Sequence, residues 1–347
     1  MTTLTSPHDL LAAVPFLIGY HPTDSIVIVA LKNESVGMAM RVDFPTVEGL
    51  QDLEVQLVAH LEREGADAAL IVAYQPAGSS QGEEILAQLA SALFRADIEV
   101  RESLLIFGSR WRSLLCCDIN CCPLEGRELP EISTSRIAAE QVALGHPMPY
   151  VDESELGQSI SSLPLSSDAQ FMASVRSFLV DQNDPDIQQI RRDGAVAVID
   201  LASRFIAGSL GKDIGDDQEI CARVIGRLSD IQVRDFALGS HDQGTQDLYW
   251  SMWRYLLRIA PVGCAAPVAT LLAAISYENG DGALARRSLE RAREDDPAYS
   301  LTILLARVFS AGWPSESFAA MRKELHPKVC AGIFEGAPHS INEEVTG

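Results

Sequence analysis

Four of the seven cysteines lie together, in the segment Cys116-Cys117-Asp118-Ile119-Asn120-Cys121-Cys122. Thiolates bind zinc and also oxidise reversibly to disulfides, so this segment is the strongest chemical signal in the sequence. A closed zinc site usually draws its four ligands from two groups of cysteine or histidine, and the sequence has one group here. Side chains of adjacent residues diverge along an extended backbone, so adjacent cysteines are not expected to bind the same ion.

Three interpretations of Cys116, Cys117, Cys121 and Cys122 follow from this pattern. The favoured one is that they are reduced thiols, packed as small apolar side chains at a corner between a strand and a loop. One alternative is a zinc site, for which a second copy of the chain would supply the missing ligands. The other is a disulfide that joins Cys116 or Cys117 to Cys121 or Cys122. The sequence therefore predicts no cofactor, with zinc as the alternative.

A second set of polar residues lies around a predicted β-hairpin: His21, Asp24, Ser25, Arg41 and Asp43. If the turn centres on Asn33-Glu34, Ser25 lies opposite Val42 and Asp24 opposite Asp43, with Arg41 one pair further in. Two carboxylates, an arginine and a hydroxyl at a sheet end suit a metal ion, a phosphate or an internal ion-pair network. The local alternative is that residues 23–25 cap a turn while Arg41 pairs with Asp43.

Buried strands and amphipathic helices alternate through the first half of the chain and position both sets of residues. Strands are predicted at 25–31, 38–43, 68–74, 99–107 and 110–116, from continuous or alternating apolar patterns. Helical spacing predicts helices at 50–64 and 83–95, and a short first helix that ends before Pro15. Helices between buried strands indicate a three-layer α/β domain, and the hairpins make its sheet mixed.

The second half shows helical spacing alone, so the predicted fold class is α+β overall. The expected order is an α/β mixed-sheet domain at 1–149, a linker at 150–167, an all-α domain at 168–328 and a loose tail at 329–347. Residues 272–297 have the spacing of a tetratricopeptide unit, in which small residues let two helices pack closely. The all-α domain is therefore expected to be tetratricopeptide-like, and a plain helical bundle is the alternative.

Charge and hydropathy exclude several classes of protein. The formal net charge of -21 repels phosphate backbones and anionic lipid, so neither nucleic acid nor a membrane is an expected partner. The first apolar run, at 10–20, lacks a preceding basic segment and is too short to span a bilayer, which predicts a cytoplasmic protein. Signatures of nucleotide-binding loops, serine-hydrolase elbows and zinc proteases are absent, and catalysis stays open.

Four motifs in order resemble a known family. They are the run from Leu10 to Val27, Arg41 to Pro45, Arg110 to Cys116 with Cys121 to Gly126, and Gly280 to Ala285 with Asp296 to Leu301. This order is similar to that of the actinobacterial domain of unknown function 4192 family, and the likeness spans about residues 10–313. No activity is established for that family, so the resemblance implies no catalytic residue. Cys117 does not belong to its pattern.

These observations favour a non-enzymatic adaptor or regulatory protein whose helical half binds a protein partner. The rival is an enzyme or small-ligand sensor that uses the sheet end around Asp24, Ser25, Arg41 and Asp43. A third hypothesis is a metal or redox protein centred on residues 116–122. A homo-oligomer is compatible with each of the three.

Overall fold

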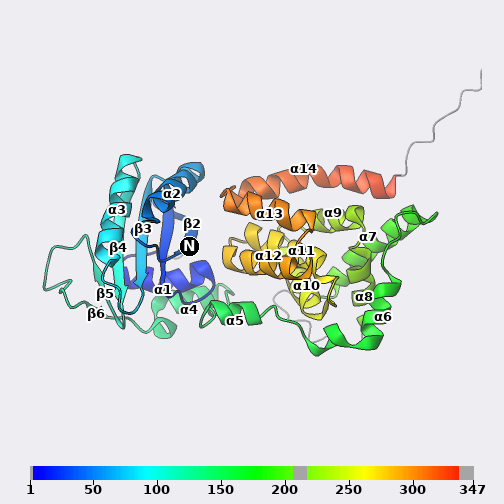
Figure 1. The fold of residues 1–347 in the computed structure, drawn as a ribbon, viewed down its shortest axis with the longest axis horizontal. Coiled ribbons are helices and arrows are strands. Elements are labelled where there is room, and N and C mark those ends of the chain that lie inside the picture. Colours follow the sequence, from blue (N-terminus) through cyan, green and yellow to red (C-terminus); the bar gives the residue numbers. More distant parts are fainter. Residues whose placement is uncertain (1–2, 206–216, 336–347) are drawn as a thin grey trace, which may run out of the picture. The chain divides into compact units, whose positions relative to one another are not determined.

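The computed structural model describes residues 3–205 and 217–335 (Figure 1). The first half alternates strands and helices and the second half is helical, which confirms the predicted α+β class. The chain divides into two compact units. The α/β unit runs through Ser159 and includes Gly280–Ala283 and Ala311–Pro314, and the helical unit holds the other described residues.

The α/β unit is built on a six-stranded sheet with the order β2-β1-β3-β4-β5-β6. The strands are β1 Ser25–Lys32, β2 Ser35–Asp43, β3 Ala68–Gln75, β4 Glu99–Phe107, β5 Arg110–Ser113 and β6 Arg127–Glu128. β3 and β4 pair in parallel, and the other neighbours pair antiparallel. The sheet is therefore mixed, as predicted. The two-residue strand β6 was not predicted, because it is too short to show a pattern.

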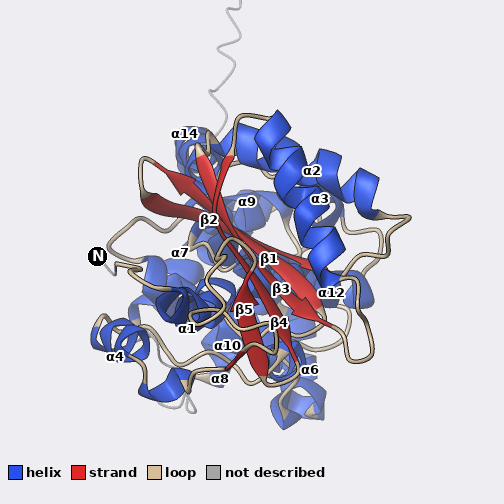
Figure 2. Ribbon diagram, turned by 90° about the vertical axis from the view of Figure 1, so that its left-hand side faces the viewer, coloured by secondary structure: helices blue, strands red, loops and turns tan. Residues whose placement is uncertain are grey.

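Helices cover both faces of this sheet (Figure 2). On one face, α2 (Leu50–Glu64) and α3 (Gly82–Arg95) bury leucines and isoleucines against alternate residues of the strands. On the other lies α1 (Pro7–Ile18), whose His8 ring meets the Trp111 ring edge-on at 5.1 Å. α4 (Arg136–Ala143) packs on α1. These three layers bury the apolar runs that predicted the strands.

α1 continues past Pro15, where the sequence predicted its end. Its first turn is capped by Ser6, which accepts a hydrogen bond from the Asp9 backbone, and it stops at Gly19 with φ of 84°. A proline inside a helix removes one backbone hydrogen bond. Here the helix buries seven of its residues, and that burial offsets the loss.

The β1–β2 hairpin has the predicted turn but a different register. Asn33 and Glu34 both have positive φ, at 49° and 63°, as a two-residue turn of type I′ requires. Ser25 lies opposite Asp43, not opposite Val42, so the predicted register is wrong by one residue. The cause is an irregularity between Val29 and Leu31, where β2 contains one more residue than β1.

The stretch predicted as a linker, 150–167, contains short helices. α5 (Glu153–Gln158) is capped by the Asp152 carboxylate, which accepts from the Glu155 N–H at 2.7 Å, and a 3-10 helix η2 spans Pro164–Ser167. Leu156 is buried. An acidic residue of the stretch predicted as a linker, Asp152, therefore acts as a helix cap.

Nine helices are described in the second half of the chain. They are α6 Ala169–Ser177, α7 Ile187–Ser203, α8 Gln218–Arg227, α9 Ile231–Gly239, α10 Gln246–Ile259, α11 Ala265–Glu278, α12 Gly282–Asp295, α13 Ser300–Ser310 and α14 Ser315–Phe334. Helix α14 corrects the prediction of a loose tail from residue 329, because it continues to Phe334 and buries Ile333. Residues 336–347 of that predicted tail lie outside the described residues.

Helices α11 to α14 share one apolar core. It joins Ala273 and Ala274 of α11, Leu289 of α12, Leu301 of α13 and Phe318 of α14. Short connections separate α11 from α12 and α13 from α14, as consecutive helix pairs require. The assignment of these pairs to the tetratricopeptide class stays a prediction.

A buried polar cluster joins three separated parts of the helical unit. Arg322 on α14 donates from Nε and Nη2 to the two carboxylate oxygens of Glu278, at 2.6 and 3.0 Å, and from Nη1 to the carbonyls of Gly239 and His241. The Arg322 and Glu278 side chains are only 2% and 4% exposed. His241 Nε2 lies 3.1 Å from the same carboxylate, and burial lowers the pKa of His241, so its neutral ring donates there. The cluster holds α14 in place, and the buried Nδ1 of His241 has no hydrogen-bond partner among the described residues.

We predict that Arg322→Met lowers the free energy of unfolding by about 3–5 kcal/mol, because it leaves the Glu278 carboxylate buried without its main partner. The double variant Glu278→Met with Arg322→Met should lose much less, since no unpaired charge remains. Urea denaturation of these two variants and of Glu278→Met gives their free energies of unfolding, and with the unchanged protein they form a double-mutant cycle. Equal losses in the single and double variants would contradict this account.

Candidate functional site

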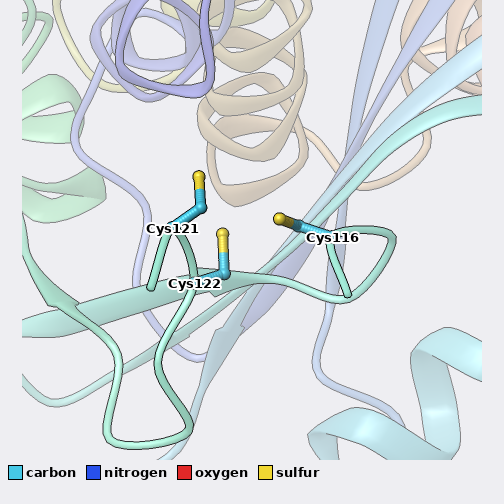
Figure 3. Close-up of side chains that lie close together, drawn as sticks. All are labelled: Cys116, Cys121 and Cys122. Atoms are coloured by element: carbon cyan, nitrogen blue, oxygen red, sulfur yellow. The ribbon is translucent and has the colours of Figure 1, made fainter. Parts of the chain in front are cut away.

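Three of the four clustered cysteines bring their sulfur atoms together (Figure 3). The Sγ atoms of Cys116, Cys121 and Cys122 all lie within 4.8 Å of one another, in the loop between β5 and β6. Among residues 3–205 and 217–335, no other trio of cysteine, histidine or carboxylate ligands converges in this way. The exposed Cys117 is not part of this thiol cluster.

Cys121 and Cys122 are adjacent in the chain, yet their sulfur atoms do not diverge as those of an extended backbone would. The backbone N–H groups of both residues donate to the carbonyl of Asp118, at 3.0 and 2.7 Å. The chain is therefore folded into a turn here, and the alternation of an extended backbone does not apply. Of the adjacent pair Cys116 and Cys117, the first alone joins the cluster.

Side chains from the sheet bind the backbone of this loop at two places, one near Cys116 and one near Cys121. Ser113 Oγ donates to Glu102 Oε1 at 2.6 Å and accepts from the backbone N–H of Cys116 at 3.2 Å. Across the loop, Arg127 of β6 donates to the carbonyls of Cys121 and of Asn120. The arms that carry the sulfur atoms are thus tied to β5 and to β6 by bonds that do not involve the thiols.

Gly126 closes the loop where it returns to the sheet. Its φ is 74°, and a Cβ on this residue would lie 2.7 Å from Cζ of Phe107 and 3.0 Å from the carbonyl oxygen of Trp111. Arg110 Nη1 donates to the Gly126 carbonyl at 2.6 Å. Only glycine fits this backbone without strain, so the return of the chain to β6 depends on it.

The exposure of the thiols does not fit the interpretation as small apolar packing residues. Cys117 and Cys121 are exposed, and Cys116 and Cys122 are half-buried. A cysteine kept for packing alone is normally among the most buried side chains, as Cys221 is in α8. Three convergent and accessible thiols are instead suited to metal binding or to thiol chemistry.

Hydrogen bonding within the cluster separates the acidities of two of its thiols. Hydrogen bonds with the backbone of Asp118 and then with the Cys122 thiol hold the pKa of Cys116 below its usual value. Burial, followed by the hydrogen bonds to Cys116 and Cys121, raises the pKa of Cys122 to about 11. Cys116 is therefore the more acidic of these two thiols.

The five hairpin residues do not form a comparable site. Arg41 makes an ion pair with Asp43, whose side chain is 86% exposed. Asp24 is an exposed turn residue with φ of 45°, and His21 is half-buried. Ser25 is fully buried, and its Oγ has no hydrogen-bond partner among the described residues. The local alternative, in which Arg41 pairs with Asp43, is the arrangement that the structure contains.

No motif in the sequence indicates His241, Glu278 or Arg322 as a group. They lie 37 and 44 residues apart along the chain, and nothing in their local sequence links them. A cavity of about 150 Å³ lies beside Glu278 and Arg322, and Asp242, Glu316 and Lys323 also line it. Because the Glu278 carboxylate already accepts three hydrogen bonds from Arg322 and His241, it offers a ligand in this cavity few free acceptor sites.

A family comparison covers most of the chain. Residues 7–316 match the family model described as domain of unknown function (DUF4192), and the chain belongs to that family. No curated protein and no solved structure matches the chain. The matched residues of the family model include the thiol cluster and most of the helical half. Within the described residues, no helix is both long enough and apolar enough to cross a membrane.

We predict that Cys116 is alkylated faster than Cys122 in the reduced, metal-free protein between pH 7 and 9. The lowered pKa of Cys116 places thiolate there as the pH rises, whereas Cys122, with a pKa of about 11, stays protonated through this window. Timed iodoacetamide labelling with peptide mass spectrometry measures both rates. Faster labelling of Cys122 would show that the assigned order of acidities is reversed.

Proposed function

We propose that the protein binds a thiophilic metal ion of the zinc type through Cys116, Cys121 and Cys122. The observation that carries this proposal is the convergence of three Sγ atoms within 4.8 Å. Zinc–sulfur bonds of about 2.3 Å in a tetrahedron place ligand sulfurs about 3.8 Å apart. The loop needs only a small closing movement to meet that spacing.

The loop is built so that this movement leaves the sheet undisturbed. Ser113 and Arg127 anchor backbone atoms on either side, while the thiols make no hydrogen bond outside the loop and Ser113. Within the described residues, no fourth cysteine, histidine or carboxylate joins the cluster. A bound ion would therefore have an open coordination position for water or another ligand, as exchangeable and catalytic zinc sites do.

Metal titration of the reduced chain tests the proposal. We expect one Co²⁺ or Zn²⁺ per chain, with thiolate-to-cobalt charge-transfer absorption in the cobalt form. Serine at position 116, 121 or 122 should each weaken binding at least about 10–100-fold, the loss that even outer-sphere partners cause. Cys117→Ser is the matched control and should bind as the unchanged protein does. Metal binding that survives the triple serine variant would overturn the proposal.

A second candidate function is binding of a protein partner by the helical half. Its support is the presence of exposed apolar pairs, Val196 with Ile199 on α7 and Ile303 with Leu304 on α13. Single exposed apolar residues are ordinary, whereas large exposed apolar patches mark contact surfaces, and two such residues on one helix add to the same exposed area. Paired helices such as α11 with α12 and α13 with α14 would present such surfaces if the tetratricopeptide-like assignment holds.

Charge substitution on the full chain tests this candidate. Ile303→Glu with Leu304→Glu should abolish partner crosslinking, or self-association measured by light scattering, without lowering the urea midpoint, because both side chains are exposed. Gln51→Glu with Gln56→Glu, at exposed positions of α2 in the α/β unit, is the control with the same added charge. Unchanged association in the α13 variant would remove α13 from the candidate surface.

A further inference from the structure

We propose that the thiol cluster is also a redox switch: a hydroperoxide converts Cys116 and one of Cys121 or Cys122 into a disulfide, and the bound ion is released. The loss of the ion rests on the metal binding proposed above, whereas disulfide formation does not. The observations behind the proposal are the position of three accessible thiols within 4.8 Å and the geometry of their backbone.

Backbone geometry makes Cys116 the required partner in the disulfide. Cys121 and Cys122 are adjacent, and Cα atoms joined by a trans peptide lie about 3.8 Å apart. Disulfides usually need about 4.4–6.8 Å between Cα atoms, and no described peptide bond is cis. A bond between these two neighbours is therefore strained, and Cys117 lies outside the cluster. Both unstrained pairings within the cluster contain Cys116.

The chemical step is balanced with a hydroperoxide as the oxidant. One cysteine thiolate attacks the peroxide, the O–O bond breaks, and the sulfur becomes a sulfenic acid while hydroxide or alkoxide leaves. A neighbouring thiol then attacks this sulfur, the S–O bond breaks, water leaves with the thiol proton, and the disulfide forms. Two electrons pass from the two sulfurs to the peroxide, and a cellular dithiol reverses the change.

The loop tolerates this change because its anchors are not thiols. Residues 114–126 belong to no helix or strand, and the bonds from Ser113 and Arg127 reach backbone atoms that oxidation does not alter. A disulfide removes two of the three thiolate ligands at once. One remaining thiolate cannot hold a zinc-type ion against solution chelators.

Disulfide mapping of the metal-free, reduced protein tests the switch. Trypsin releases all four clustered cysteines in the peptide 113–127, which should become lighter by two hydrogens after treatment with hydrogen peroxide. Cys121→Ser and Cys122→Ser should each still form the bond, because either residue suffices. Cys116→Ser, and the double variant Cys121→Ser with Cys122→Ser, should not. A bond that persists in Cys116→Ser, or sulfinic acid in place of a disulfide, would overturn the proposal.

Peroxide treatment of the zinc-loaded chain separates this switch from the metal site itself. A chromophoric zinc chelator should report release of one ion as the disulfide forms, and a dithiol with fresh zinc should restore binding. Cys117→Ser should release its ion in the same way. Protein that never binds zinc yet forms the disulfide would refute the metal function alone. Protein that keeps its zinc after forming the disulfide would refute the switch.

Discussion

Pairing of β5 with β6 is the constraint on which the thiol cluster depends. Arg110 lies opposite Glu128 and Trp111 opposite Arg127, so the ends of a thirteen-residue loop are held at the distance of two neighbouring strands. Gly126 permits the chain to return without a clash, and Arg127 then reaches back to the carbonyls around Cys121. A strand of only two residues thus determines where three sulfur atoms meet.

The large features of the fold could be predicted from the sequence because they follow from apolar spacing. The five longer strands, helices α2 and α3 and the helical second half were visible as periodic patterns, whereas the short helices α4 and α5 were not predicted. The hairpin register could not be predicted, because the extra residue in β2 leaves no mark in an alternating sequence. The continuation of α14 past residue 328, the predicted end of the all-α domain, was not predicted, since Pro327 lies within the helix and its apolar residues do not gather on one face.

The candidate site shows the same limit at the level of side chains. The cysteine segment was evident from its composition, yet the choice of three sulfurs out of four depends on a turn at Asp118 that joins the backbone of Cys121 and Cys122. Periodicity does not report such turns. The Arg322–Glu278 pair is hidden for a different reason, because its members are brought together only by the packing of α14 on α9 and α11.

The three thiols of the cluster lie within residues 116–122, and this short span limits how much a link between them can stabilise the folded chain. Whatever joins residue 116 to residue 121 or 122, an ion or a covalent bond, restricts only a few residues of the unfolded chain. The chain entropy removed by such a short closure is about 2 kcal/mol, well below that of a link between distant segments. Forming or breaking this link therefore changes the stability of the domain by only about that amount. The β5–β6 pairing that brings the thiols together does not need the link in order to form.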